Sequence, residues 1–230
     1  MVCGNYLRGT TTRILLNSMK HLYLIRHGET DANKLRRHQN SDEKLNAKGR
    51  VQAHHVAHLL EGKKIDAILC SPYVRARETA EVISAQLQIP YATLESVVEI
   101  KRPDYIYGQR YLSFGTMMYM GRLFVHKENP NWRYDGAENM CMLRNRIEDA
   151  KHAIAKVDGE HIAVISHDVF MNFFLYYVCR DKSVTLSQFI KILLLTKKTS
   201  NATIIHLEYN PKAPKGVCAW QLIESSVHKR

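Results

Sequence analysis

The stretch that most constrains this chain is an apolar run, Leu22–Ile25, that ends in Arg26, His27 and Gly28. An unbroken run of apolar side chains is typical of a strand buried on both faces, and the glycine ends the pattern. Such strands belong to parallel sheets covered by helices, which bind ligands beyond the carboxyl ends of their strands. The run therefore predicts an α/β protein with a guanidinium and an imidazole at a ligand-binding edge.

Two further strands are followed by polar residues in the same way. Ile65–Cys70 precedes Ser71 and Pro72, and His161–Ile165 precedes Ser166, His167 and Asp168. Because the carboxyl ends of parallel strands meet at one edge of a sheet, we expect both polar groups to lie near Arg26 and His27.

The remaining periodicity predicts helices that alternate with these strands. Apolar residues at helical spacing indicate helices over about 47–61, 73–87 and 137–157, and mostly apolar helices over 169–178 and 186–195. A short strand is expected at Tyr91–Leu94. Alternating residues at Thr203–Tyr209 and Val217–Ile223, joined by a turn at 211–216, predict antiparallel edge strands. Together these elements predict a three-layer α/β/α fold with a mostly parallel sheet.

The predicted domain is residues 19–230, preceded by an extension over residues 1–18. The extension contains Arg8, Arg13 and no acidic residue, a composition that fits an organelle-targeting segment, a disordered tail or sequence upstream of a start at Met19. Within the domain, residues 101–136 lose periodicity and gather aromatic side chains, so we expect a cap with short helices. Its aromatic residues are Tyr105, Tyr107, Tyr111, Phe114, Tyr119, Phe124, Trp132 and Tyr134.

Composition limits the partners and the compartment. A net charge of +11 suits small anionic substrates, an anionic surface or nucleic acid, but the basic residues are dispersed, which favours a solvated face over a nucleic-acid groove. The longest mostly apolar stretch, Val169–Cys179, is too short to span a membrane. An odd number of scattered cysteines without a C-x-x-C spacing predicts reduced thiols, no zinc site and a cytoplasmic protein.

Several other side chains are candidates for chemistry. Arg75 and Arg77 fall in the first turn of the helix over 73–87, where free N–H groups favour an anion, so either one could clamp phosphate. Glu99 is flanked by apolar residues, so partial burial could raise its pKa and suit it to donate a proton, with Glu95 as the alternative. His54 and His58 share a helix face, but without an intervening glutamate in an H-E-x-x-H pattern we expect no metal there.

Taken in order, these segments resemble the motifs of the histidine phosphatase superfamily, which has the phosphoglycerate mutase-like fold. The match begins at Leu24–Thr30 with Asn33. It continues through Asp42, Leu45, Gly49 and Gln52-Ala53, then through Ser71–Ala76 with Thr79-Ala80, then through Val98-Glu99-Ile100, and ends at Ile165–Asp168. The final motif departs from the family pattern, which more often has glycine where this chain has Asp168.

The resemblance implies a role for each matching residue. His27 would be the nucleophile that takes the phosphoryl group, and Glu99 would give a proton to the leaving oxygen. Arg26, Arg75 and His167 would form the phosphate pocket, with Asn33 as a further contact. The resemblance implies no metal and no cofactor, because two guanidiniums and an imidazole supply positive charge around the phosphoryl oxygens.

The resemblance also favours one branch of the superfamily. Cofactor-dependent mutases carry an Asn-Glu-Arg-x-Tyr-Gly type of stretch at the acid position, whereas this chain has Val98–Pro103, and Gly136-Ala137-Glu138 likewise resembles the phosphatase branch. We therefore expect hydrolysis of a phosphomonoester, with phosphoglycerate mutase activity as the alternative. A sugar phosphate, a nucleotide and a phosphoprotein remain open as substrates. The non-enzymatic alternative is a phosphate-ligand or nucleic-acid binding module.

Overall fold

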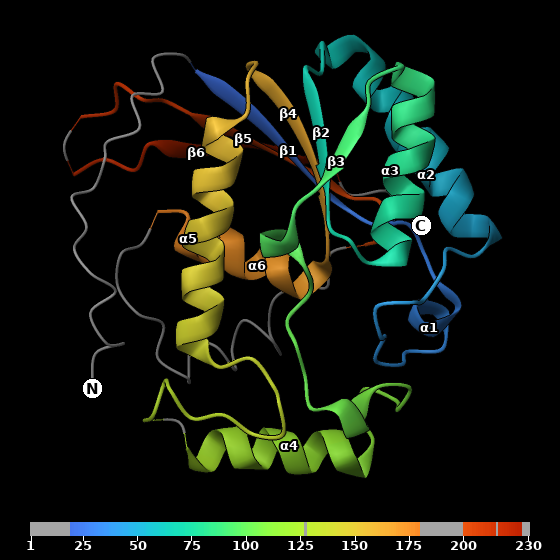
Figure 1. The fold of residues 1–230 in the computed structure, drawn as a ribbon, viewed down its shortest axis with the longest axis vertical. Coiled ribbons are helices and arrows are strands. Elements are labelled where there is room, and N and C mark those ends of the chain that lie inside the picture. Colours follow the sequence, from blue (N-terminus) through green and yellow to red (C-terminus); the bar gives the residue numbers. More distant parts are fainter. Residues whose placement is uncertain (1–18, 127, 180–199, 215, 227–230) are drawn as a thin grey trace.

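The computed structural model describes residues 19–126, 128–179, 200–214 and 216–226. A six-stranded sheet forms its centre, in the order β3-β2-β4-β1-β5-β6 (Figure 1). The strands are β1 (Lys20–Arg26), β2 (Ala67–Cys70), β3 (Tyr91–Thr93), β4 (His161–Ser166), β5 (Ile204–Tyr209) and β6 (Trp220–Ser226). The extension over residues 1–18 and the helix predicted over 186–195 lie outside the described residues.

Strand direction follows the prediction of a mostly parallel sheet. Strands β3, β2, β4 and β1 run parallel, β5 pairs antiparallel with β1, and β6 pairs antiparallel with β5. Of the two strands predicted for the edge, only β6 lies there, because β5 is enclosed between β1 and β6. Strand β1 is thus central, and its carboxyl end at Arg26 meets the carboxyl end of β4 at Ser166.

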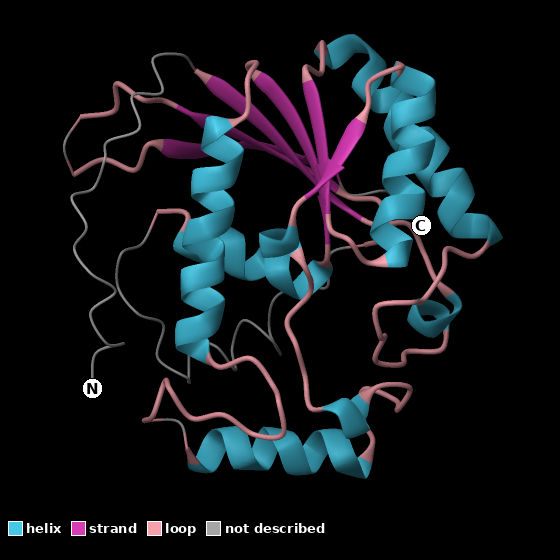
Figure 2. Ribbon diagram, in the orientation of Figure 1, coloured by secondary structure: helices cyan, strands magenta, loops and turns pink. Residues whose placement is uncertain are grey.

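Helices cover both faces of the sheet (Figure 2). Alternate residues of β1 separate the two faces: Tyr23 and Ile25 pack with α2 (Ala47–Leu60) and α3 (Val74–Leu87). Leu22 and Leu24 pack with α5 (Met140–Lys156) and α6 (Asp168–Tyr177). Since both sets of side chains are buried, the three-layer architecture is confirmed.

The cap predicted over residues 101–136 is only partly built of short helices. It holds a single 3₁₀ turn, η3 (Asp104–Ile106), and one longer helix, α4 (Phe114–Val125), which lies apart from the sheet in Figure 1. The remaining short elements are α1 (Asp31–Lys34), η1 (Glu61–Lys63) and η2 (Glu95–Val97). Among the described residues, no helix combines the length and the apolar character that a membrane span requires.

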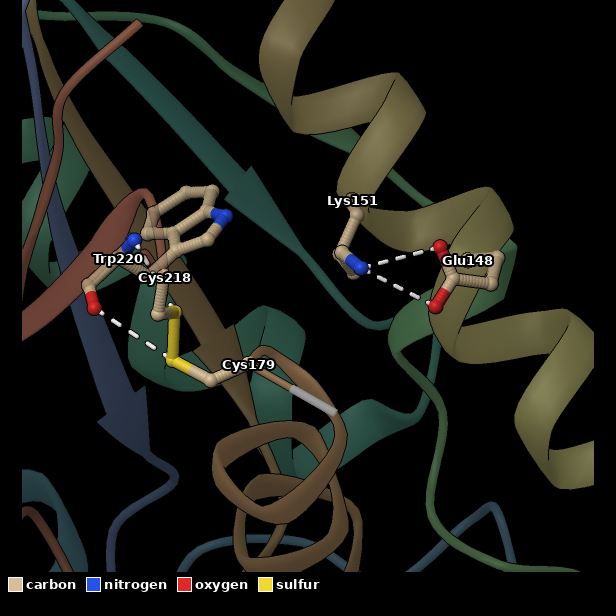
Figure 3. Close-up of a disulfide and its surroundings, with 5 residues drawn as sticks. All are labelled: Glu148, Lys151, Cys179, Cys218 and Trp220. Atoms are coloured by element: carbon tan, nitrogen blue, oxygen red, sulfur yellow. Dashed lines mark hydrogen bonds and ion pairs between the residues drawn. A yellow bond between two sulfur atoms is a disulfide. The ribbon is translucent and has the colours of Figure 1, made fainter. Parts of the chain in front are cut away.

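The prediction of reduced cysteines is wrong. Cys179, just after α6, forms a disulfide with Cys218, just before β6, and their Cα atoms lie 5.2 Å apart (Figure 3). Cys141 is also disulfide-bonded, whereas Cys70 is a free, buried thiol. The pairing was not predictable from spacing, because the bonded residues are 39 positions apart and only the path of the chain brings them together.

Candidate active site

The turn after β1 is fixed by backbone and side-chain contacts from distant segments. The His27 N–H donates to the Ser166 carbonyl at 3.0 Å, and the Gly28 N–H donates to Thr79 Oγ1 at 3.1 Å. Gly28 packs directly on Gly49 near the start of α2, where a Cβ on Gly28 would collide with the Gly49 carbonyl oxygen. The glycine that ends the apolar run is therefore required by the close approach of two backbones.

His27 is buried, and its hydrogen-bond partners determine which ring nitrogen carries the proton. Its Nδ1 lies 2.7 Å from the Gly28 carbonyl oxygen, which can only accept a hydrogen bond, so Nδ1 carries the proton. Its Nε2 accepts a hydrogen bond from Arg75 Nε at 3.2 Å. The lone pair of a neutral imidazole on Nε2 is the electron pair that a nucleophilic histidine uses.

The environment keeps His27 uncharged. Burial holds the pKa of His27 well below its ordinary value of 6.5, and the positive charges of Arg75 and Arg26 lower it further. Arg75 is itself buried, which lowers its pKa to about 10, so its guanidinium stays charged at neutral pH. Arg77, the alternative from the same helix turn, is exposed. Of the two arginines, the structure brings only Arg75 to His27.

His167 and Asn33 each have a buried polar atom without a hydrogen-bond partner among the described residues, namely Nδ1 of His167 and Nδ2 of Asn33. The ring of His167 lies beside that of His27, with 5.2 Å between centroids, and its Nε2 lies 2.8 Å from Ser71 Oγ. Burial, Arg75 and His27 hold the pKa of His167 well below 6.5. Buried unsatisfied donors are costly, and next to a charged guanidinium they suit the oxygens of an anion.

Of the two candidate acids, only Glu99 lies at the cavity. Glu99 faces a cavity, and its carboxylate accepts hydrogen bonds from the Ile100 N–H at 2.9 Å, the Phe170 N–H at 3.1 Å and the Val169 N–H at 3.3 Å. The last two donors belong to the first turn of α6, which favours a negative charge. Glu95 is exposed in η2 and does not line the cavity.

A cavity of about 570 Å³ joins the strand ends to the cap. Of the candidate catalytic residues, all but His167 line this cavity. Asp168, which lies 3.6 Å from Arg26 Nη1, lines it as well. The cap supplies mostly apolar and aromatic walls together with one guanidinium. The residues from the cap are Arg102, Ile106, Tyr111, Leu112, Thr116, Met117, Tyr119 and Met120.

Several supporting residues were missed by the sequence analysis. Asn201, in the turn before β5, donates from Nδ2 to the carbonyls of His27 and Gly28, each at 3.2 Å, and to Asn33 Oδ1 at 3.0 Å. Arg146 of α5 binds the carbonyls of Ser96 and Val98. Neither residue stands in a strand-end motif, so only the packing of the chain reveals them.

A model of the histidine phosphatase superfamily (branch 1) matches residues 22–219. Among curated relatives, the probable phosphoglycerate mutase GpmB of Proteus mirabilis is 30% identical over 154 residues, which is 66% of this chain and 71% of that protein. The adenosylcobalamin/alpha-ribazole phosphatase of Escherichia coli is 36% identical over 80 residues, 34% of this chain and 39% of that protein.

Solved structures share the fold at low sequence identity. Mycobacterial hydrolase 1 matches with a TM-score of 0.70 at 18% identity, over 90% of this chain and 98% of its own. A phosphoserine phosphatase mutant of Entamoeba histolytica, in complex with phosphoserine, matches with a TM-score of 0.68 at 21% identity, over 90% of this chain and 96% of its own.

Proposed function

Because the chain belongs to the histidine phosphatase superfamily (branch 1), we propose that it hydrolyses phosphomonoesters through a phosphohistidine on His27. The observation that carries the proposal is the state of His27, a buried neutral imidazole whose proton on Nδ1 is held by the Gly28 carbonyl. Its Nε2 contacts the side chain of Arg75. A phosphoryl group at Nε2 would thus form next to a fixed positive charge.

In the first step, Nε2 of His27 attacks phosphorus and the ester oxygen leaves. Arg75 and Arg26 neutralise the negative charge on the phosphoryl oxygens, and the unpartnered atoms of His167 and Asn33 complete the contacts. Ser71 can donate to Nε2 of His167, which leaves the proton of that neutral ring on Nδ1, directed to an oxygen. This set of donors needs no metal ion for the proposed reaction.

Glu99 serves both steps as acid and then as base. Its Oε2 accepts a single long backbone hydrogen bond, at 3.3 Å from Val169, so a proton on that oxygen can pass to the leaving alkoxide. In the second step the carboxylate takes a proton from water as the water attacks phosphohistidine. The reaction then releases inorganic phosphate and returns His27 and Glu99 to their starting states.

The substrate we propose is a small phosphomonoester with an apolar leaving group. The relatives and structural neighbours include proteins named as phosphatases of alpha-ribazole phosphate, phosphoserine and glucosyl-3-phosphoglycerate, so small phosphorylated molecules suit this fold. In this chain the cavity above the phosphate residues is walled by Ile106, Leu112, Met117 and Met120. Such walls stabilise an aryl or alkyl group better than a polyol, which needs polar partners.

The test is hydrolysis of an aryl phosphate by the purified full chain in the presence of EDTA. We expect His27→Ala to lower kcat by on the order of 10⁴-fold, because no nucleophile remains to form the covalent intermediate. His54→Ala, on the exposed face of α2, is the control and should leave kcat unchanged. A His27→Ala enzyme that hydrolyses the ester at the wild-type rate would refute the proposal.

Phosphoglycerate mutase activity is the second candidate, favoured by the similarity to GpmB. A mutase returns the phosphoryl group to a second hydroxyl of the substrate before water reaches phosphohistidine. A coupled assay for interconversion of phosphoglycerate isomers, primed with a bisphosphorylated glycerate, distinguishes the two reactions. We expect phosphate release without isomerisation.

A further inference from the structure

Three side chains of types that ligate metal ions lie near the end of the sheet opposite His27. His21 is the second residue of β1, whereas Arg26 is its last, so the two are separated by about 16 Å of extended strand. Beside His21 stand His206 and Glu208 of the neighbouring strand β5. All three side chains are half-buried, and none of them belongs to the candidate active site.

The pairing of β1 with β5 places these side chains on one face. His21 is directly opposite Glu208, and Tyr23 is opposite His206 in the antiparallel register. Because alternate residues of a strand share a face, His21, His206 and Glu208 all project to the side of the sheet on which Tyr23 and Ile25 are buried. The arrangement is therefore built into the register of the sheet and does not depend on a loop.

Distances within the group match those between the ligands of one ion. Nδ1 of His21 lies 3.1 Å from Nε2 of His206 and 3.4 Å from Oε1 of Glu208. One donor atom from each of the three residues lies within 4.8 Å of the others. In a tetrahedral zinc site with bonds of about 2.0–2.1 Å, neighbouring donor atoms are about 3.3 Å apart. The group thus needs little rearrangement to hold an ion.

Neighbouring side chains hold the ring of His21 in place. The ring of His161 stacks on that of His21, with 4.4 Å between centroids, and its Nδ1 lies 3.2 Å from the Tyr23 hydroxyl.

We propose that His21, His206 and Glu208 bind one divalent transition-metal ion, with Zn²⁺ as the preferred ion. Two imidazole nitrogens and one carboxylate oxygen are ligands that zinc accepts in tetrahedral sites, and a water molecule would fill the fourth position. Bound there, the ion links β1 to β5 at the end of the sheet away from the cavity. It stabilises the fold and takes no part in the phosphatase reaction proposed above.

The test is calorimetric titration of ZnCl₂ into the full chain, purified without a histidine tag and stripped with EDTA, together with Tm with and without zinc. We expect one site and a rise in Tm for the wild type. His206→Ala and Glu208→Gln should each weaken zinc binding at least tenfold and remove the rise in Tm. Circular dichroism of the metal-free variants checks their folding, and His206→Gln replaces His206→Ala if the latter does not fold.

The matched control is the double variant His54→Ala/His58→Ala, because these exposed histidines at i, i+4 on α2 are the competing chelating pair in the described part of the chain. It should retain the single zinc site. The proposal is overturned if the wild type gives no binding heat and no rise in Tm, or if the double variant loses zinc while His206→Ala keeps it. Hydrolysis of an aryl phosphate in EDTA reports on the proposed function separately.

Discussion

At the scale of single residues, the chemistry of this site depends on the burial of His27. An exposed imidazole would be partly protonated near neutral pH, and a protonated ring has no lone pair for attack on phosphorus. Burial, Arg75 and Arg26 together hold the pKa of His27 well below 6.5, so the proposed nucleophile is unprotonated at neutral pH. In the proposed reaction, the two arginines that bind the phosphoryl group thus also favour the unprotonated form of His27.

Replacing Arg75 tests both of these roles. Arg75→Gln removes a charge that stabilises the transferring phosphoryl group, so we expect kcat/KM to fall by about 10²–10³-fold. It also removes a positive charge beside His27, which raises the pKa of that ring. The acidic limb of the pH profile of kcat/KM should therefore move to higher pH, because protonation of His27 removes the lone pair on Nε2 and would now occur at a higher pH.

The exposed neighbour Arg77 supplies the control for this experiment. Arg77→Gln removes a positive charge from the same turn of α3, but from an exposed side chain. It should leave both kcat/KM and the acidic limb of its pH profile unchanged. An acidic limb that stays in place in Arg75→Gln would contradict the electrostatic coupling between Arg75 and His27.

At the scale of elements, helix α5 positions the segment that carries Glu99. Arg146 forms a bidentate ion pair with Glu138, at 2.7 and 2.6 Å, and its Nη1 donates to the carbonyls of Ser96 at 3.1 Å and Val98 at 2.7 Å. The side chain of Glu138 is only 7% exposed. One guanidinium therefore ties η2 and the residue that follows it to α5.

We expect Arg146→Met to destabilise the fold by about 3–5 kcal/mol, because it leaves the Glu138 carboxylate buried without its partner. It should also lower kcat, since the segment before Glu99 loses two hydrogen bonds. Urea unfolding followed by circular dichroism measures the first effect, and steady-state hydrolysis of an aryl phosphate measures the second.

The same helix offers a matched control, the Lys151–Glu148 ion pair shown in Figure 3. Since the side chain of Glu148 is 38% exposed and the two residues are three positions apart on one helix, Lys151→Met should cost less than about 1 kcal/mol and leave kcat unchanged. Equal losses in the two variants would show that α5 does not position Glu99 through Arg146.

At the scale of the whole molecule, the fold brings distant motifs to one edge. Arg26 is the last residue of β1 and His27 follows it, Ser71 follows β2, and His167 follows β4. These three strands are adjacent in the sheet. Helix α3 then directs Arg75 back to the same place. On the other side of the cavity the cap faces this edge with apolar side chains, so the sheet provides the chemistry and the cap defines the leaving group in the proposed function.

The disulfide between Cys179 and Cys218 links the end of α6 covalently to the start of the edge strand β6. For the sequence separation of 39 between Cys179 and Cys218, loop closure predicts a stabilisation of about 4 kcal/mol. The variant Cys179→Ser/Cys218→Ser should thus lower Tm by roughly 10 °C in differential scanning calorimetry. Mass spectrometry of alkylated wild-type protein checks the bond itself. An alkylated Cys179 in non-reduced protein would contradict the disulfide. The cytoplasmic location stays a prediction.

The sequence by itself determined the α/β class, most of the succession of strands and helices along the chain, and the position of Arg26, His27 and His167 at strand ends. An apolar run that ends in polar residues predicts a strand with polar side chains at its end, because the strand and the residues after it are contiguous in the chain. The boundaries of the helices predicted over 47–61, 73–87 and 137–157 agree with those in the structure to within three residues.

Only the tertiary structure decided between alternatives that local patterns cannot separate. It brought Arg75 and not Arg77 to His27, turned Glu99 and not Glu95 to the cavity, and paired cysteines that the sequence analysis took to be reduced. It also gathered His21 with His206, which are 185 positions apart. The physical reason is the same in each case: burial, charge and ligand distance depend on contacts between distant segments, and the path of the chain sets those contacts.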